Sequence, residues 1–402
     1  MRIAMISEHA SPLAALGGVD AGGQNRHVAE LAATLGRQGH AVTVYTRRDS
    51  VQAPVRVSVD GYDVVHVPAG PPVALEKDGL LPYMDRFGWW LAQRWRSGDP
   101  PPDVIHAHFW MSGLAAVRAA GRHIPTVLTY HALGAVKRRY QAHNDTSPAE
   151  RLIIEARLGH QVDRVIAQCR DEAAELARLG VPPSRLEIIP SGVDIDRFRP
   201  DGPRSPIVPG RPRILAAGRL VPRKGFDDLV RAVASLPRTE LVVLGGAGAP
   251  ADEPEGRRLL DLADRLGVVD RVKLPGAVPP DQMPRWYRSA AVAACTPWYE
   301  PFGLTPLEAM ACGTPVVTYA VGGLSESVVD GLTGLHVPPG DVSALADALG
   351  MVCSDQALRG RLSRAATHRV RAYYTWDLTA SRLAQVYAAV GVRRREHEEV
   401  VS

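Results

Sequence analysis

The sequence predicts an α/β protein built from two doubly wound domains with parallel sheets. Short apolar runs typical of buried strands alternate with helical segments along both halves of the chain. A stretch rich in proline and glycine, RPDGPRSPIVPGRPR at residues 199–213, interrupts this alternation near the middle. The 402 residues also exceed what a single hydrophobic core usually supports. Strands separated by helices imply parallel sheets that are covered on both faces.

The first half contains the elements of one such sheet. Val28, Leu31, Ala32 and Leu35 recur at helical spacing after the first strand, and residues 150–179 are expected to be helical. Strands are expected at RIAMIS (2–7), AVTVYT (41–46), DVVHVPAG (63–70), DVIHAHF (103–109) and TVLTYHA (126–132).

The pattern starts again after the interruption. Helices are indicated by Phe226, Leu229, Val230 and Val233, and by a similar apolar spacing at 342–349. Strands are expected at 213–218, 240–246, 271–276, 291–297, 315–321 and 334–339. We expect an N-terminal domain over 1–203, a C-terminal domain over 211–375, and a helix at 376–392 that packs back on the N-terminal domain. Because ligands of open α/β sheets bind outside the carboxyl ends of strands, a central cleft between the domains is the expected site.

Composition excludes several classes of function. Lys and Arg number 47 against 43 Asp and Glu, a net charge of +4 that does not suggest a nucleic-acid partner. The four cysteines form no CxxC pair, which is typical of free thiols in a reducing compartment. The sequence has no signal-peptide pattern and no apolar run of the ~18 residues that a membrane span needs. We therefore expect a cytoplasmic protein without stable membrane insertion.

A glycine-rich loop precedes the first helix, which is expected to begin near Gly23. Gly22 and Gly23 would let the backbone approach an anion at the helix N-terminus, although a flexible surface turn would explain the glycines equally well. The dinucleotide fingerprint G-x-G-x-x-G is absent. The second strand ends in Arg47 and Arg48, without the acid that holds a ribose in nicotinamide-binding sheets. An oxidoreductase is therefore disfavoured.

Two carboxylates eight residues apart are the most informative feature of the second half. Glu300 follows a predicted strand, and Glu308 lies in a helix expected to begin near Gly303 or Leu304. Backbone N–H groups from Phe302 onward would then lie at a helix N-terminus, where they suit a phosphate. Carboxylates that accept hydroxyl hydrogen bonds beside an anion site match a sugar nucleotide. The alternative is a helix with acids that favour its dipole.

Two cations follow the first strand of the same domain, in the stretch GRLVPRKG. Arg219 and Lys224 would project from the carboxyl end of that strand, where they could bind a diphosphate. Taken alone, each would be read as a solvated surface charge. Because the same domain also contains Glu300 and Glu308, we favour a role for Arg219 and Lys224 in binding a nucleotide diphosphate.

GRLVPRKG and EPFGLTPLEAMACGTPVV closely resemble the retaining glycosyltransferases of family 4, which have the two-domain GT-B fold with Rossmann-like domains. GGVDAGGQN is similar to their N-terminal glycine loop, and Glu300 and Glu308 match their E-x7-E motif. The resemblance implies that Arg219 and Lys224 bind the diphosphate and that Glu308 holds the ribose. It implies a catalytic set of His131, Arg219, Lys224 and Glu300, and further donor contacts from Gly22, Gly23, Phe302, Gly303 and Leu304.

The same resemblance implies the chemistry. Front-face attack retains the anomeric configuration, and the departing phosphate takes the acceptor proton, so no enzyme nucleophile is required. No tightly bound cofactor is expected, and Mg²⁺ would enter only with the donor. His106 and His108 lie two apart on one strand face, but no third ligand of suitable spacing is evident, so no metal site is predicted.

The acceptor is expected to be a small hydroxylated molecule, such as a cyclitol, an aminocyclitol or a sugar, phosphorylated or not. The mycothiol-pathway members of the family, which glycosylate inositol phosphate, carry a tyrosine where Phe109 stands and a threonine where Ala132 stands. Two hydroxyls that would hold a phosphate are thus missing, which argues against inositol phosphate. The candidate acceptor residues are Lys77, Phe109, Arg138, Arg139 and Arg151.

The predicted function is therefore that of a retaining glycosyltransferase which uses a nucleotide sugar, with uridine as the expected base. The alternative is a non-catalytic protein that binds nucleotide sugars. The two differ in turnover and not in binding. The sequence makes no prediction of oligomeric state.

Overall fold

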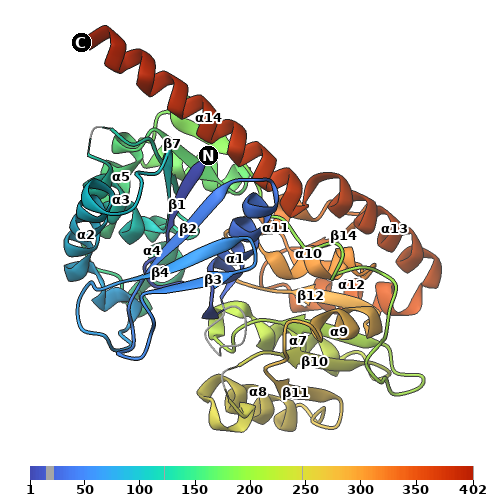
Figure 1. The fold of residues 1–402 in the computed structure, drawn as a ribbon. Helices are drawn as coiled ribbons and strands as arrows, with labels where there is room; N and C mark the ends of the chain where they lie inside the picture. Colours follow the sequence, from blue (N-terminus) through green and yellow to red (C-terminus); the bar gives the residue numbers. More distant parts are fainter. Residues whose placement is uncertain (15–21, 122, 247, 402) are drawn as a thin grey trace. The chain divides into compact units, whose positions relative to one another are not determined.

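The chain divides into two compact units in the computed structural model, which describes residues 1–14, 22–121, 123–246 and 248–401 (Figure 1). The first unit joins Met1–Pro190 to Trp376–Ser402, and the second is Ser191–Thr375. Each contains one sheet with helices packed against it. The predicted doubly wound α/β architecture is confirmed in both units.

The first unit is built on an eight-stranded sheet of order β3-β4-β2-β1-β5-β6-β7-β8. All neighbouring strands are parallel except β3, which is antiparallel to β4. The strands are β1 (Arg2–Ile6), β2 (Ala41–Arg47), β3 (Arg56–Val59), β4 (Tyr62–Val67), β5 (Val104–His108), β6 (Thr126–Thr129), β7 (Arg164–Ala167) and β8 (Leu186–Ile188).

Both faces of this sheet are buried, as β1 illustrates. Ile3 and Met5 pack in a core with residues of α1, whereas Ala4 and Ile6 pack in a second core with residues of α2. Successive strand residues point to opposite faces, so a strand covered on both sides reads as a continuous apolar run. The helices are α1 (Gly23–Arg37), α2 (Met84–Ser97), α3 (Trp110–Ala120), α4 (Gly134–Gln141), α5 (Arg151–Gln161), α6 (Arg170–Arg178) and α14 (Trp376–Val401).

The expectation of helices over 150–179 is confirmed by α5 and α6 but missed β7 between them. Arg164–Ala167 is a fully buried strand between α5 and α6, paired with β6 and β8. Its RVIA sequence is a short β-branched run, and a run of that length cannot be told from a buried helical turn by periodicity. Its partners in the sheet decide the conformation.

The second unit has a six-stranded, fully parallel sheet of order β11-β10-β9-β12-β13-β14. Its strands are β9 (Arg213–Ala217), β10 (Glu240–Leu244), β11 (Val272–Gly276), β12 (Val292–Cys295), β13 (Val316–Tyr319) and β14 (Gly334–Val337). Its helices are α7 (Phe226–Ala234), α8 (Pro254–Arg265), α9 (Met283–Ser289), α10 (Leu304–Ala311), α11 (Leu324–Ser327), α12 (Val342–Ser354) and α13 (Gln356–Tyr373).

The division between the units at Pro190 and Ser191 lies before the segment rich in proline and glycine. Val193 forms a β-bridge with Thr375. Phe198 is buried with its ring centroid 6.1 Å from that of Tyr287. These contacts tie the residues just before the segment to the second unit.

The last helix, α14, belongs to the first unit and closes one of its cores. Trp376, Leu383 and Tyr387 are buried in the same cluster as residues of α1 and β1. The Tyr387 hydroxyl lies 2.6 Å from Nδ1 of His106 on β5, and Nε2 of His106 lies 2.9 Å from the Thr129 hydroxyl. Both nitrogens of the buried His106 ring are therefore bound to hydroxyl groups.

Within the described residues, no helix is both long and apolar enough to cross a membrane. All four cysteines are free.

Replacing Tyr387 by phenylalanine tests how tightly α14 is held. Tyr387→Phe leaves Nδ1 of His106 without its hydroxyl in a buried site, so we expect the free energy of unfolding to fall by about 1–3 kcal/mol. Urea unfolding measures it. Tyr373→Phe is the matched control because the Tyr373 side chain is 60% exposed, and it should change stability little. Equal stability of the two variants would contradict the role of this hydrogen bond.

Candidate active site

The loop that carries Glu300 connects β12 to α10 and is held by close backbone packing. Gly323 donates its backbone N–H to the Glu300 carbonyl at 3.0 Å. A Cβ at Gly322, whose φ is +48°, would lie 2.2 Å from the Glu300 carbonyl oxygen. Only glycine fits at that position without moving the loop. The helix beyond the loop begins at Leu304 with Gly303 as its N-cap, which confirms the predicted start.

Glu300 and Lys224 form an ion pair at this loop, with 2.6 Å between Lys224 Nζ and Glu300 Oε2. Lys224 ends a short 3-10 turn (Pro222–Lys224) after β9. The turn is fixed by Gly225, where φ is +64° and a Cβ would lie 2.0 Å from the Thr296 carbonyl oxygen. The structure thus brings together two residues that are 76 positions apart in the chain.

The charge of Glu300 is set by opposing effects. Burial alone would raise its pKa, but Lys224, then Arg223, and finally Arg219 outweigh burial and lower the pKa below the ordinary value of 4.5. Arg219 itself is exposed. Arg223 lies in the motif GRLVPRKG but was not singled out from the sequence, and its guanidinium carbon lies 5.4 Å from the Tyr299 ring centroid. The loop therefore combines an ionised carboxylate with three cations.

Glu308 lies inside α10 and is buried, 3% exposed. The Tyr287 hydroxyl on α9 donates a hydrogen bond to its Oε2 at 3.0 Å. Phe302 is also buried, with its ring centroid 6.3 Å from that of Tyr374. The contact from Tyr287 was missed in the sequence because nothing local links it to Glu308.

In the first unit, the start of α1 is fixed by polar side chains. Gly22 is the N-cap, and the Asn25 side chain accepts its backbone N–H at 3.2 Å. Gln24 Nε2 donates to the His108 carbonyl at 3.2 Å and lies 3.3 Å from the Ser7 hydroxyl. The predicted start of the helix is confirmed. The part of the loop GGVDAGGQN before Gly22 lies outside the described residues.

His131 follows β6 in a left-handed conformation, with φ of +61°. Its Nε2 lies 3.0 Å from Nδ1 of His108, and its ring centroid lies 4.8 Å from that of His27 on α1. Burial lowers the pKa of all three histidines, that of His27 to about 3, so the rings are neutral at physiological pH. A nonglycine residue at positive φ is uncommon and often marks a functional site.

The grouping of histidines differs from the one considered in the sequence. His108 joins His27 and His131, and the ligand nitrogens of these three residues lie within 4.8 Å of one another. His106 instead binds the hydroxyls of Tyr387 and Thr129. The pair considered in the sequence, His106 and His108, is therefore not the group that the structure forms, because His27 and His131 reach His108 from other elements. Neutral imidazoles are a donor set that zinc accepts.

Three of the predicted acceptor residues meet at Phe109, which follows β5. Phe109 is buried, with φ of +88°. Lys77 Nζ lies 5.2 Å from its ring centroid, and the Arg151 guanidinium carbon lies 5.1 Å from the same centroid. Two cations therefore lie at cation–π distance from the Phe109 ring.

The arginines predicted for the acceptor site are engaged by carboxylates. Arg151 is 1% exposed and donates to Glu155 Oε1 at 2.7 Å and to the Ala132 carbonyl at 2.6 Å. Arg139 forms a two-point ion pair with Glu175, at 2.8 and 3.0 Å. Nε of Arg138 lies 3.9 Å from Oδ2 of Asp145. The sequence identified these cations but not their partners.

Two further polar residues, Glu8 and His9, follow β1 and were not singled out from the sequence. Glu8 Oε1 lies 2.7 Å from Nδ1 of His9. The His9 ring lies edge-on to Phe109, with 4.9 Å between centroids. The sequence could have indicated them, because an acid and a histidine directly follow the first strand.

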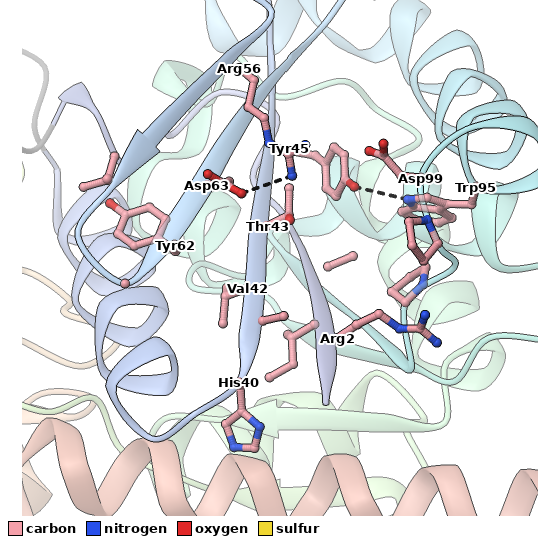
Figure 2. A pocket seen from close by; sticks show the side chains of 17 residues that line it. Arg2, His40, Val42, Thr43, Tyr45, Arg56, Tyr62, Asp63, Trp95 and Asp99 are labelled. Atoms are coloured by element: carbon pink, nitrogen blue, oxygen red, sulfur yellow. Dashed lines mark hydrogen bonds and ion pairs between the residues drawn. The ribbon is translucent and has the colours of Figure 1, made fainter.

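A measurable cavity of about 460 Å³ lies at the opposite end of the same sheet (Figure 2). It is lined by the first residues of β1, β2 and β4, such as Arg2, Val42 and Asp63. Figure 2 shows two pairs among its polar groups: Arg56 with Asp63, at 3.1 Å, and Tyr45 with Trp95, at 3.2 Å. The predicted site residues of the first unit follow the carboxyl ends of strands and do not line this cavity.

Both units match known protein families. The family model for Glycosyltransferase Family 4 matches residues 21–197, and that for Glycosyl transferases group 1 matches 200–369. A D-inositol 3-phosphate glycosyltransferase from Xylanimonas cellulosilytica is 40% identical over 98% of each chain. A sucrose-phosphate synthase structure from Thermosynechococcus elongatus is 30% identical with a TM-score of 0.89, covering 98% of this chain and 100% of that one. Anabaena HepE, in complex with UDP-glucose, shares the fold at 20% identity and a TM-score of 0.74, over 97% of this chain and 100% of its own.

The ion pair at Glu300 predicts a specific dependence of stability on pH. Because the folded protein lowers the pKa of Glu300, the pair stabilises the fold above the ordinary pKa of 4.5, and this contribution is lost as the pH falls through the lowered value. The wild type should therefore lose more stability on acidification than Glu300→Gln. Lys224→Met is the control, because removal of the strongest cause of the lowered pKa of Glu300 should make the loss of stability on acidification smaller than in the wild type. Parallel pH profiles of unfolding free energy for wild type and Glu300→Gln would contradict this account.

Proposed function

The chain belongs to glycosyltransferase family 4 and has the GT-B fold, and we propose that it transfers a hexosyl group from a UDP-sugar to a hydroxyl group of a small acceptor. The family makes it a retaining nucleotide-sugar glycosyltransferase; the base and the acceptor class are our proposal. Its main support is the ion pair of Lys224 with Glu300, in the loop before α10, the helix that carries the buried Glu308. A cyclitol, an aminocyclitol or a sugar would be the acceptor.

On the donor side, we assign Arg219 and Lys224 to the diphosphate and Glu300 to the sugar. When the anomeric C–O bond breaks, negative charge grows on the leaving diphosphate. Cations already in place stabilise that charge more than the charge of the bound donor, which lowers the barrier. Lys224 now binds Glu300, so an incoming diphosphate would compete with this carboxylate for the ammonium group. The acceptor oxygen then bonds to the same face of the anomeric carbon, and its proton passes to the departing phosphate.

Glu308 is assigned to the ribose of the nucleotide. The Tyr287 hydroxyl occupies its Oε2 and fixes the carboxylate inside α10. An ionised carboxylate only accepts hydrogen bonds, and ribose hydroxyls can donate them. The backbone N–H groups of Phe302, Gly303 and Leu304, at the helix start, are assigned to the donor as well. From the first unit, Gly22, Gly23 and His131 are assigned to the donor on the family resemblance.

On the acceptor side, the contacts of Arg151 argue against a phosphate. Its guanidinium already binds the carboxylate of Glu155, the Ser147 hydroxyl at 3.0 Å and the Ala132 carbonyl. Phe109 and Ala132 offer no side-chain hydroxyl. A phosphate bound here would have to share this guanidinium with a buried carboxylate, which already compensates its charge. The relatives that match over nearly the whole chain are named for D-inositol 3-phosphate, and we expect this chain to prefer an acceptor without a phosphate at Arg151.

The function is tested by assaying the purified chain with UDP-glucose, UDP-N-acetylglucosamine, GDP-glucose and ADP-glucose against cyclitols, aminocyclitols, sugars and sugar phosphates. We expect transfer or slow donor hydrolysis with a UDP-sugar. Tight binding of a nucleotide sugar by calorimetry without turnover would support the non-catalytic alternative. A thermal-shift screen with the same donors identifies the base, because a ligand that binds the folded state raises its stability.

Lys224→Ala removes the ammonium group assigned to the leaving diphosphate. We expect kcat/KM to fall by roughly 10²–10³-fold, since one fixed donor to a developing anion contributes a few kcal/mol. Lys273→Ala is the matched control, because Lys273 is an exposed lysine of the same unit on β11. Wild-type turnover in Lys224→Ala would refute the assigned role.

Glu155→Gln tests the reason for rejecting a phosphorylated acceptor. Loss of the carboxylate leaves the charge of Arg151 uncompensated, so the ratio of kcat/KM for inositol phosphate to that for inositol should rise about tenfold, or about 1.4 kcal/mol. Glu175→Gln, which releases the exposed Arg139, is the control and should leave the ratio unchanged. A wild-type chain that prefers inositol phosphate would overturn the argument.

A further inference from the structure

We propose that His27, His108 and His131 form a binding site for one divalent transition-metal ion, with zinc as the favoured ion, and that the bound ion inhibits the enzyme by occupying His131. The metal site is independent of the proposed function, whereas the inhibition rests on the role assigned there to His131. All three residues belong to the first unit, so the site needs no residue of the second.

Three elements of the first unit bring these side chains together. His27 lies in the second turn of α1, His108 ends β5, and His131 follows β6, the strand that pairs with β5. One ligand nitrogen from each ring lies within 4.8 Å of those of the other two, and Nδ1 of His108 is 3.0 Å from Nε2 of His131. Two ligands of a tetrahedral zinc ion are about 3.4 Å apart, so small side-chain rotations would bring all three rings onto one ion.

The ligand set consists of neutral rings. Burial is the main cause that lowers the pKa of all three histidines, and in either tautomer of a neutral ring one nitrogen bears no proton. Imidazoles suit zinc, copper, nickel and iron, whereas magnesium and calcium prefer oxygen ligands. Zinc is favoured because its d electrons impose no geometry, and three histidines with one open position are a ligand set that zinc accepts.

His108 provides a second observation that points to a ligand. Its side chain is 0% exposed, and its Nε2 has no hydrogen-bond partner within the part of the chain that the structure describes. A buried polar nitrogen without a partner costs free energy, and native structures contain few of them. A bound metal ion would supply the partner that this ring lacks.

The neighbours of the three histidines orient the rings and exclude water. Gln168 Nε2 lies 3.3 Å from Nδ1 of His27, and the buried Trp376 ring packs edge-on against the His27 ring with 5.3 Å between centroids. Hydrogen bonds to the second nitrogen of a ligating imidazole fix its orientation in metal sites. His106 lies against His108 but is not a ligand, because hydroxyl groups bind both of its nitrogens.

His131 gives the site access to solvent and couples it to catalysis. His27 and His108 are buried, whereas His131 is partly exposed, so an ion can enter beside its ring and a water molecule can take the fourth position. His131 is also the residue assigned to the donor sugar. A ring held by a metal cannot bind the sugar at the same time, so we expect the ion and the donor to weaken each other's binding by the same factor.

The first test measures binding and does not require turnover. The full chain without an affinity tag is stripped with a chelator and titrated with Zn²⁺ by calorimetry, and we expect one ion per chain with a Kd below about 10 µM. X-ray absorption of the zinc-loaded chain should show imidazole nitrogens at about 2.0–2.1 Å and no sulfur. Weaker binding, or a sulfur ligand from a cysteine, would overturn the inference.

The second test removes one ligand and leaves His131 in place. His27→Gln should weaken Zn²⁺ binding by about 100-fold or more, because loss of a residue that only orients a ligand already costs roughly 10–100-fold. His108→Gln should do the same, and it serves as the test if His27→Gln does not fold. His160→Gln is the matched control, because His160 is an exposed histidine of the same unit on α5. Wild-type affinity in a folded ligand variant would overturn the inference.

The third test concerns inhibition and uses transfer or donor hydrolysis. Saturating Zn²⁺ should lower kcat/KM for the donor of the wild type and of His160→Gln by about tenfold or more, and a chelator should restore it. His27→Gln, compared with its own activity without zinc, should be inhibited far less at the same concentration. Full activity of the zinc-loaded wild type would overturn the inhibition while the proposed function stands. Absence of turnover with every donor would overturn the proposed function and the inhibition with it, and the binding tests alone then decide the metal site.

Discussion

A parallel sheet that is covered on both faces leaves its strands no solvent side, and this constraint determines where chemistry can occur in both units. Ile3 and Met5 face one core and Ala4 and Ile6 the other, so β1 carries no charged side chain after Arg2, its exposed first residue. Polar side chains inside such a sheet need buried partners, as His106 has, so side chains that are to meet a ligand lie where strands end. At the carboxyl end of a strand, the next helix begins, and its first backbone N–H groups lie at the same edge of the sheet. An anionic ligand can therefore be bound at that end without any charge being buried in the sheet.

The polar groups at these strand ends are bound to one another before any substrate arrives. Lys224 binds Glu300, Arg151 binds Glu155, and Glu8 binds both His9 and Ser112. The pairs differ in accessibility: Arg151 and Glu155 are buried, whereas about a sixth of each side chain is exposed in the pair of Lys224 and Glu300. A buried pair is costly to break and positions its surroundings, while a half-open pair can exchange one partner for a ligand. The exposed fraction of each pair thus distinguishes a cation that can bind a ligand, such as Lys224, from one that holds the surrounding structure, such as Arg151.

What the sequence could predict follows from the range of the interactions. The start of α10 and the spacing of Glu300 and Glu308 were predictable, because helix caps and loop lengths are written in neighbouring residues. The hydrogen bond of Ser112 with Glu8 was not predictable, since 104 positions separate the two residues and neither residue type indicates a particular partner. The same holds for His27 beside His131, on different elements. β7 was missed because its four residues are too few to show a period, and its neighbours in the sheet decide its conformation.

The path of the chain has a consequence for biosynthesis. The second unit is inserted between Pro190 and Trp376, so the first unit is assembled from the beginning and the very end of the polypeptide. Until the last helix leaves the ribosome, the core around Val28 and Leu31 lacks Leu383 and Tyr387, and His106 lacks its hydroxyl partner. The inserted unit can complete its fold during translation, whereas the unit that begins the chain must wait for termination. A premature stop codon before residue 376 would thus leave the earlier-made half with an open core that is exposed to proteases and chaperones.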